Sequence, residues 1–159
     1  MFLGEYTHAL DNKGRLTLPA RWREELGDRV VITRGLDQCL FVFPAAKFET
    51  IANEIEQVGL TKGDVRALSR YLSAKAMDDV PDKQGRIIIP PALREFAGLD
   101  GDALVVGAFS RIEIWNAERY AEANRRLEVD VQNVSERIGD LMQRAMAKGS
   151  GGSPGGGVE

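Results

Sequence analysis

The sequence predicts an α+β fold in which one small unit of short strands and helices occurs twice. The segment DNKGRLTLP at residues 11–19 returns as DKQGRIIIP at residues 82–90, with Asp, Gly, Arg and Pro at the same spacing. Between the Arg and the Pro, both copies carry apolar residues typical of a strand. An internal repeat constrains the architecture more strongly than any single residue does. We therefore interpret the chain as a duplicated β-rich module.

The order of the predicted elements is also the same in both copies: a turn, a strand, a helix opened by proline, further strands and a second helix. The other matching segments are 22–24 with 93–95, 40–43 with 112–115, and 45–48 with 117–120. Each copy is too short to bury a sizeable core by itself. The two copies are therefore expected to fold together around one shared core.

The first copy begins with a predicted strand at 6–10. A turn follows at 11–14, because Asp and Asn side chains cap turns and Gly accepts a positive φ. Residues 15–18 are predicted as the return strand of this hairpin. Pro19 suits the first turn of a helix, where its missing N–H is not needed, and Gly27 suits a left-handed C-cap.

Two strands at 30–33 and 39–43, rich in β-branched and aromatic residues, follow with a turn near Gly35. Cys39 is the only cysteine in the chain, so it cannot form an internal disulfide, which is typical of a protein from a reducing cytosol. A free cysteine packs as a small apolar side chain. We therefore predict that Cys39 is a buried strand residue.

Two helices are predicted between the copies, because apolar residues recur at helical spacing in 48–58 and again in 65–72. Gly59 ends the first helix, and Pro81 prevents the second from continuing into the next turn. In the second copy, Pro90-Pro91 opens the corresponding helix, and Gly98 ends it.

A long C-terminal helix is predicted from a heptad-like seam of apolar residues, which are Leu127, Val131, Val134, Ile138, Leu141 and Ala145. The seam fits a helix that lies on its own domain and a contact between subunits equally well. From residue 149 the chain consists mostly of glycine with serine and proline, and we predict that this tail is disordered.

Charge is segregated along the chain, although the net charge is only −3. Basic residues outnumber acidic ones in 11–23 and 82–94, whereas the C-terminal third is acidic. Local basic patches, rather than the overall charge, are typical of proteins that bind nucleic acid. No apolar run is long enough to span a bilayer, and the N-terminus lacks the layout of a secretory signal. We therefore expect no membrane partner.

The two Asp-x-x-x-Arg turns form the candidate binding site. In a tight hairpin, the carboxylate can accept hydrogen bonds from the turn backbone and orient the guanidinium. A planar guanidinium suits phosphate groups and guanine edges. The glycines leave room for a ligand near the backbone, and the lysines add positive charge. The candidate residues are Asp11, Lys13, Gly14, Arg15, Asp82, Lys83, Gly85 and Arg86.

The same arginines could instead pair with acidic residues of a neighbouring subunit. We interpret Arg23 and Arg94 as helix-surface or salt-bridge residues rather than ligands, and Trp22 and Trp115 as core residues.

Enzyme chemistry is poorly supported by the sequence. One His and one Cys do not supply a zinc site of the usual spacing. The chain has no recognisable nucleophile–base pair and no glycine-rich nucleotide fingerprint. We therefore predict a protein that is not an enzyme, with no catalytic residues, no metal and no cofactor.

The residues of both turns and their surroundings resemble the MraZ family over roughly residues 1 to 145. The resemblance rests on MFLGEY at 1–6, on 11–15 with Leu18-Pro19 and Arg23, on 82–90 with Leu93-Arg94, and on the segments 35–37, 39–40 and 113–115. It implies tandem SpoVT-AbrB-like domains, which form an AbrB-like β-barrel of swapped hairpins with flanking helices within one chain. The expected ranges are 5–52 and 76–122 for the two domains, 123–148 for a C-terminal helix and 149–159 for the disordered tail.

The resemblance also implies a function. Proteins of this family are expected to be bacterial transcriptional regulators in the cytoplasm, at the nucleoid. They bind tandem direct repeats in double-stranded promoter DNA as homo-oligomeric rings and repress their own operon of division and cell-wall genes. The family's DNA-contact motif falls on Asp11 with Arg15 and on Asp82 with Arg86. The alternative is an oligomeric, antitoxin-like interaction module whose basic loops bind an acidic protein.

Overall fold

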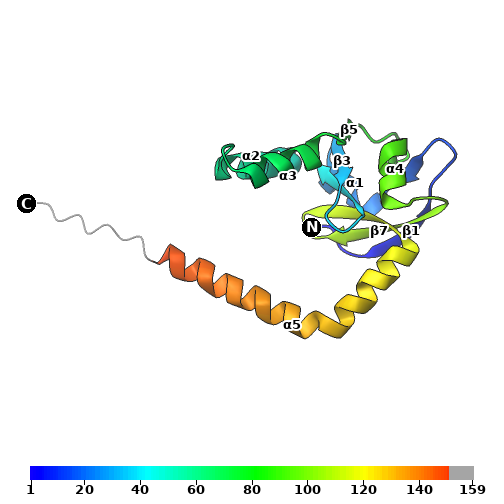
Figure 1. Ribbon diagram of the computed structural model, residues 1–159. Helices are drawn as coiled ribbons and strands as arrows, with labels where there is room; N and C mark the ends of the chain where they lie inside the picture. Colours follow the sequence, from blue (N-terminus) through cyan, green and yellow to red (C-terminus); the bar gives the residue numbers. More distant parts are fainter. Residues whose placement is uncertain (151–159) are drawn as a thin grey trace, which may run out of the picture. The chain divides into compact units, whose positions relative to one another are not determined.

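The computed structural model describes residues 1–150 and consists of two units (Figure 1). The first unit, Met1–Tyr120, contains antiparallel strands together with helices, so the predicted α+β class is confirmed. The second unit begins at Ala121 and is helical up to residue 149. The predicted tail, 149–159, lies almost entirely outside the described residues, and Gly149 is the last residue of the final helix.

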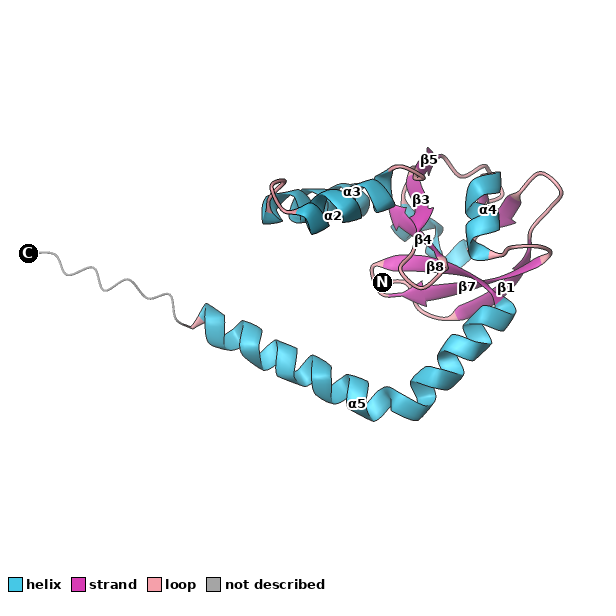
Figure 2. Ribbon diagram, in the orientation of Figure 1, coloured by secondary structure: helices cyan, strands magenta, loops and turns pink. Residues whose placement is uncertain are grey.

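The four strands of the first copy lie within one residue of the predicted ranges, and four more strands follow in the second copy (Figure 2). They are β1 (Glu5–Ala9), β2 (Arg15–Thr17), β3 (Val30–Arg34), β4 (Leu40–Pro44), β5 (Met77–Asp79), β6 (Arg86–Ile88), β7 (Asp102–Ala108) and β8 (Arg111–Asn116). The first four belong to the first copy of the repeat and the last four to the second.

Helices follow each pair of consecutive strands along the chain. They are the 3₁₀ turn η1 (Ala20–Trp22), α1 (Arg23–Leu26), α2 (Ala45–Val58), α3 (Gly63–Ser73), α4 (Pro91–Ala97) and α5 (Ala117–Gly149). Figure 2 shows α2 and α3 side by side, and both pack near β3. Gly98 ends α4 in the left-handed conformation. The left-handed cap predicted at Gly27 is wrong, because Gly27 combines a φ of 73° with an extended ψ of −161°, which leads the chain toward β3.

The third and fourth strands pair within each copy, as β3 with β4 and β7 with β8, whereas the other strand pairs join the two copies. The six-stranded sheet has the order β1-β7-β8-β4-β3-β5, so the first strand of each copy lies against the third strand of the other. The strands β2 and β6 form a separate antiparallel ribbon. The predicted hairpin between 6–10 and 15–18 was therefore wrong in its pairing, because the turn at 11–14 passes the chain from one sheet to the other.

The described strands thus form one open sheet and one two-stranded ribbon, and no closed barrel is found among residues 1–150. The two outer strands of the larger sheet, β1 and β5, are joined to the ribbon strands through the Asp-x-x-x-Arg turns. The second strands of the two copies, β2 and β6, pair with each other in the ribbon, and the larger sheet joins the copies through their other strands.

One core is shared by both copies, as the short length of each copy predicts. Its largest fully buried side chains come from both halves, and they include Leu16, Leu18, Ile32, Ile87, Ile89 and Leu93. Trp22 and Trp115 are both buried, at 2% and 6% exposure, so their interpretation as core residues is confirmed. Burial of apolar surface across the copies is therefore the main stabilising term for both halves at once.

The C-terminal helix α5 has no buried residue, and several side chains of its apolar seam are about half exposed. Gly139 lies inside this helix without interrupting it. No helix among residues 1–150 is both long and apolar enough to cross a lipid bilayer.

Cys39 is fully buried, immediately before β4, as the sequence predicts. Burial raises the pKa of its thiol to about 12, and the nearby Glu113 carboxylate acts in the same direction. Because the thiolate is the reactive species, we expect the native protein at pH 8 to react very slowly with a thiol reagent such as DTNB, and the urea-unfolded protein to react fully within minutes. Fast labelling of the native protein would contradict this burial.

Candidate nucleic-acid interface

The first turn is held closed by the carboxylate of Asp11. Its Oδ1 accepts hydrogen bonds from the backbone N–H groups of Lys13 at 2.9 Å and Arg15 at 2.8 Å, and its Oδ2 accepts from Arg15 Nε at 2.6 Å. Gly14 completes the turn at φ 79° by donating its N–H to the Asp11 carbonyl. The carboxylate therefore both closes the turn and fixes the direction of the arginine side chain, as the spacing predicts.

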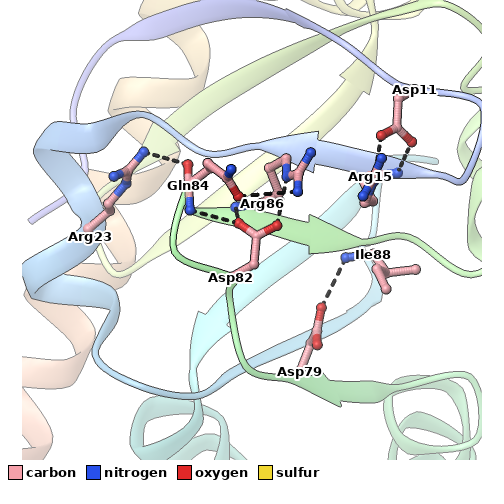
Figure 3. Close-up of polar contacts among 8 residues, drawn as sticks. All are labelled: Asp11, Arg15, Arg23, Asp79, Asp82, Gln84, Arg86 and Ile88. Atoms are coloured by element: carbon pink, nitrogen blue, oxygen red, sulfur yellow. Dashed lines mark hydrogen bonds and ion pairs between the residues drawn. The ribbon is translucent and has the colours of Figure 1, made fainter.

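The second turn repeats this geometry and adds one contact (Figure 3). Asp82 Oδ1 accepts from the N–H groups of Gln84 and Arg86, and Asp82 Oδ2 accepts from Arg86 Nε at 2.6 Å. In addition, Arg86 Nη2 donates to Gln84 Oε1 at 3.2 Å. The first copy has Lys13 at the position of Gln84, so the described residues offer Arg15 no equivalent side-chain acceptor.

Both arginines lie on one exposed face of the β2–β6 ribbon. Directly opposite residues of an antiparallel pair share a face, and successive residues alternate. The register pairs Arg15 with Ile88 and Arg86 with Thr17, while Leu16 and Ile87 pair between them and are fully buried. Arg15 and Arg86 therefore point away from the core on the same side, and about 7 Å of strand separates them along the ribbon.

Apart from the Nε of each arginine and the Arg86 Nη2 bond to Gln84, the polar groups of both guanidinium groups are available for a partner. The Nε of each arginine is bound to its Asp, and the two side chains are 32% and 29% exposed. Lys13 and Lys83 are exposed on the same turns, and neither forms an ion pair with another described residue. The two turns thus present four cationic side chains, one pair at each end of the β2–β6 ribbon.

The glycines of the turns are covered by protein. The carbonyl of Gly14 accepts from Ile89 N–H at 2.8 Å, and that of Gly85 accepts from Leu18 N–H at 2.9 Å, so each turn is bound by the strand end of the other copy. A Cβ atom at Gly14 would lie 3.1 Å from Arg94 Cζ. The space that we predicted for a ligand at Gly14 is therefore occupied by an arginine, and direct ligand contact at the two glycines stays a prediction.

Arg23 lies on the exposed surface of α1, as predicted, and Arg94 is half-buried on α4. Each also lies against the turn of the other copy. Arg23 Nη2 donates to the Gln84 carbonyl at 2.6 Å (Figure 3), whereas Arg94 Nε is buried without a hydrogen-bond partner among the described residues. Sequence reasoning missed this contact, and the only signal for it was that both arginines recur at the same place in the repeat.

Asp79 is a second residue that sequence reasoning missed. Its Oδ2 accepts from the backbone N–H of Ile88 at 2.9 Å and so ties β5 to the outer edge of β6 (Figure 3). This hydrogen bond satisfies a backbone N–H at the end of the short β2–β6 ribbon, where the pairing of the two strands offers no acceptor.

The hydrogen bonds of the turns make their stability dependent on pH. The backbone N–H of Arg15 lowers the pKa of Asp11, and that of Arg86 lowers the pKa of Asp82, from the ordinary value of 3.8. A lowered pKa in the folded state means that the carboxylates stabilise the fold fully above the unfolded-state pKa. This stabilisation is lost as the pH falls below about 4 and through the folded-state pKa.

We therefore expect the variant Asp11→Asn/Asp82→Asn to be less stable than the wild type at pH 7, and the difference to shrink steadily as the pH falls below about 4. Urea unfolding at a series of pH values measures this difference. The control is Asp140→Asn, which removes a carboxylate from α5. A difference that stays constant with pH would contradict the role of the two carboxylates.

Comparison with known proteins agrees with the repeat. The family model described as "MraZ protein, putative antitoxin-like" matches residues 1–71 and 74–141, so each matched segment contains one Asp-x-x-x-Arg turn. A protein of Desulforamulus reducens named "Transcriptional regulator MraZ" is 43% identical over 142 residues, which cover 89% of this chain and 100% of that protein.

Two further relatives carry the same name. The protein of Natranaerobius thermophilus is 43% identical over 141 residues, covering 89% of this chain and 99% of its own. The protein of Salinispora arenicola is 46% identical over 138 residues, covering 87% of this chain and 97% of its own.

Proposed function

The chain belongs to the MraZ family, and from this premise we propose that it is a transcriptional regulator that binds specific sites in double-stranded promoter DNA. The observation that carries the proposal is the placement of Arg15 and Arg86 on one exposed face, each oriented by its own Asp. The names of the relatives support a regulatory rather than an enzymatic role.

The DNA contacts would come from the two turns. Arg15 and Arg86 would present their Nη groups to phosphates or to guanine edges in the major groove, where the planar fork makes two parallel hydrogen bonds. Lys13 and Lys83 would add phosphate contacts, which supply affinity without sequence information. Asp11 and Asp82 would complete the DNA-contact motif by holding the arginines in place.

A single chain offers only a small basic surface, so we propose that several copies act together. In a homo-oligomeric ring, several pairs of turns could engage tandem direct repeats at once, which can raise the overall affinity by roughly 10²–10⁴ without new contacts. Bound upstream of its own operon of division and cell-wall genes, in the cytoplasm at the nucleoid, such a ring would block the polymerase and act as a repressor.

We also propose that residues 5–52 and 76–122 are two SpoVT-AbrB-like domains whose hairpins are exchanged within the chain. The pairing of β1 with β7 and of β5 with β3 supports this interpretation.

A mobility-shift assay with DNA from upstream of the protein's own gene, at 50 mM and 200 mM salt, tests the function. Specific DNA binding predicts a shifted band that competitor DNA of random sequence does not remove, and a marked loss of affinity at the higher salt concentration. Absence of any shift at both concentrations would contradict the proposal and favour the antitoxin-like alternative, in which the basic turns bind an acidic protein.

A further inference from the structure

The second turn is held from outside by Arg23, which belongs to the first copy of the repeat. Arg23 begins α1, and its Nη2 donates to the carbonyl of Gln84, in the middle of the second turn, at 2.6 Å (Figure 3). The guanidinium lies so close over Gly85 that a Cβ atom there would be 2.7 Å from Arg23 Cζ. The close packing of Arg23 over Gly85 and its hydrogen bond to Gln84 together fix the backbone of these two residues relative to the first copy.

Gln84 passes this restraint on to the candidate DNA-contact residue. Its backbone carbonyl accepts from Arg23, its backbone N–H donates to Asp82, and its side-chain Oε1 accepts from Arg86 Nη2. Asp82 in turn accepts from Arg86 Nε. The direction of the Arg86 side chain therefore depends on a hydrogen-bond network that includes Arg23, although no hydrogen bond joins Arg23 to Arg86 directly.

The first turn lacks an equivalent network. Arg94 lies against Gly14 as Arg23 lies against Gly85, but within residues 1–150 it donates no hydrogen bond to the first turn, and its Nε has no partner. Lys13 takes the place of Gln84 and cannot accept a hydrogen bond from Arg15 through its side chain. The two turns are thus alike in shape and unequal in how firmly they are held.

We propose that Arg23 is a positioning residue for DNA binding, which acts through Gln84 and Gly85 to hold Arg86 in its binding orientation. This inference rests on the proposed function. Preorganisation of this kind raises affinity because less conformational freedom is lost on binding. It also makes the second turn the rigid contact and the first turn the adaptable one.

A double-mutant cycle separates positioning from direct contact with DNA. The probe is the DNA from upstream of the protein's own gene, called the operator here. If Arg23 acts through Arg86, Arg23→Ala should weaken binding to this DNA by about three- to tenfold in the wild-type background and by less than about twofold in the Arg86→Ala background. If Arg23 bound a phosphate directly, or only stabilised the fold, the double variant would lose DNA affinity by the product of the factors measured for Arg23→Ala and Arg86→Ala. Such a multiplicative loss of affinity would therefore overturn the inference.

Two further variants control for charge and folding. Arg21→Ala removes a cation two residues away, whose Nη1 donates to Tyr6 Oη, and its effect should multiply with that of Arg86→Ala. Arg23→Lys keeps the charge but lacks the planar group over Gly85, so it should bind DNA like Arg23→Ala. Wild-type affinity of Arg23→Lys would also overturn the inference.

The thermal midpoint and the size of every variant are measured alongside, so that affinities are compared between folded proteins of the same oligomeric state. If Arg86→Ala by itself bound the operator as tightly as the wild type, the proposed function of the second turn would fail, and the inference with it. If Arg86→Ala weakens binding while the Arg23 and Arg86 losses multiply, only the inference fails.

Discussion

Replacing Arg15 and Arg86 together by alanine is expected to weaken operator binding by roughly 100-fold or more, because each bidentate arginine contact contributes about 1–3 kcal/mol. Both side chains are partly exposed on the β2–β6 ribbon, and neither supports the core. The fold and the size of the assembly should therefore stay unchanged. The plot of log affinity against log salt concentration should become shallower, by about 0.9 for each phosphate contact removed.

Fluorescence anisotropy with labelled operator DNA at several salt concentrations measures both effects, and light scattering measures the size of the assembly. The matched control is Arg125→Ala/Arg126→Ala, which also removes two cations, but from α5, where both pair with Glu122. If the variant Arg15→Ala/Arg86→Ala bound DNA with wild-type affinity, this result would contradict the DNA-binding assignment. Equal losses in the turn variant and the control would show that only the total charge matters.

Replacing Ile87 by alanine is expected to destabilise both copies of the repeat together, by about 2–5 kcal/mol. Ile87 is fully buried in β6, directly opposite the fully buried Leu16 of β2, so the cavity would open between the copies. Because the first strand of each copy pairs with the third strand of the other, neither copy keeps its sheet if its partner unfolds. Unfolding should therefore be one cooperative transition.

The two tryptophans report on the two copies separately. Trp22 lies in the first copy and Trp115 in the second, so the variants Trp115→Phe and Trp22→Phe each leave a single probe. Urea unfolding at a fixed protein concentration should give the same midpoint with both probes, and Ile87→Ala should lower both midpoints equally. The control, Ile88→Ala, changes a half-exposed neighbour and should alter the stability by no more than about 0.5 kcal/mol. Separate midpoints for the two probes would contradict the interleaved fold.

Much of the candidate site could be predicted because its chemistry is local. Asp11 and Arg15 are four residues apart in a turn with a glycine, and the carboxylate caps the backbone N–H groups as that spacing implies. The same holds for Asp82 and Arg86. The contact of Arg23 was not predicted because its partner, the Gln84 carbonyl, is distant in the sequence and is a backbone atom, which carries no signal in the residue type.

The sequence by itself determined that a module is duplicated, where its strands and helices lie, and that two aspartate-held turns each present an arginine. Periodicity, turn residues and proline positions act over a few residues, so they can be interpreted without the rest of the chain. Only the tertiary structure decided which strands pair and which turn each of Arg23 and Arg94 covers. The physical reason is the duplication itself. Two copies of one module offer strands of the same pattern, so pairing within a copy and pairing between copies satisfy the local rules equally well. The choice depends on burying one shared core.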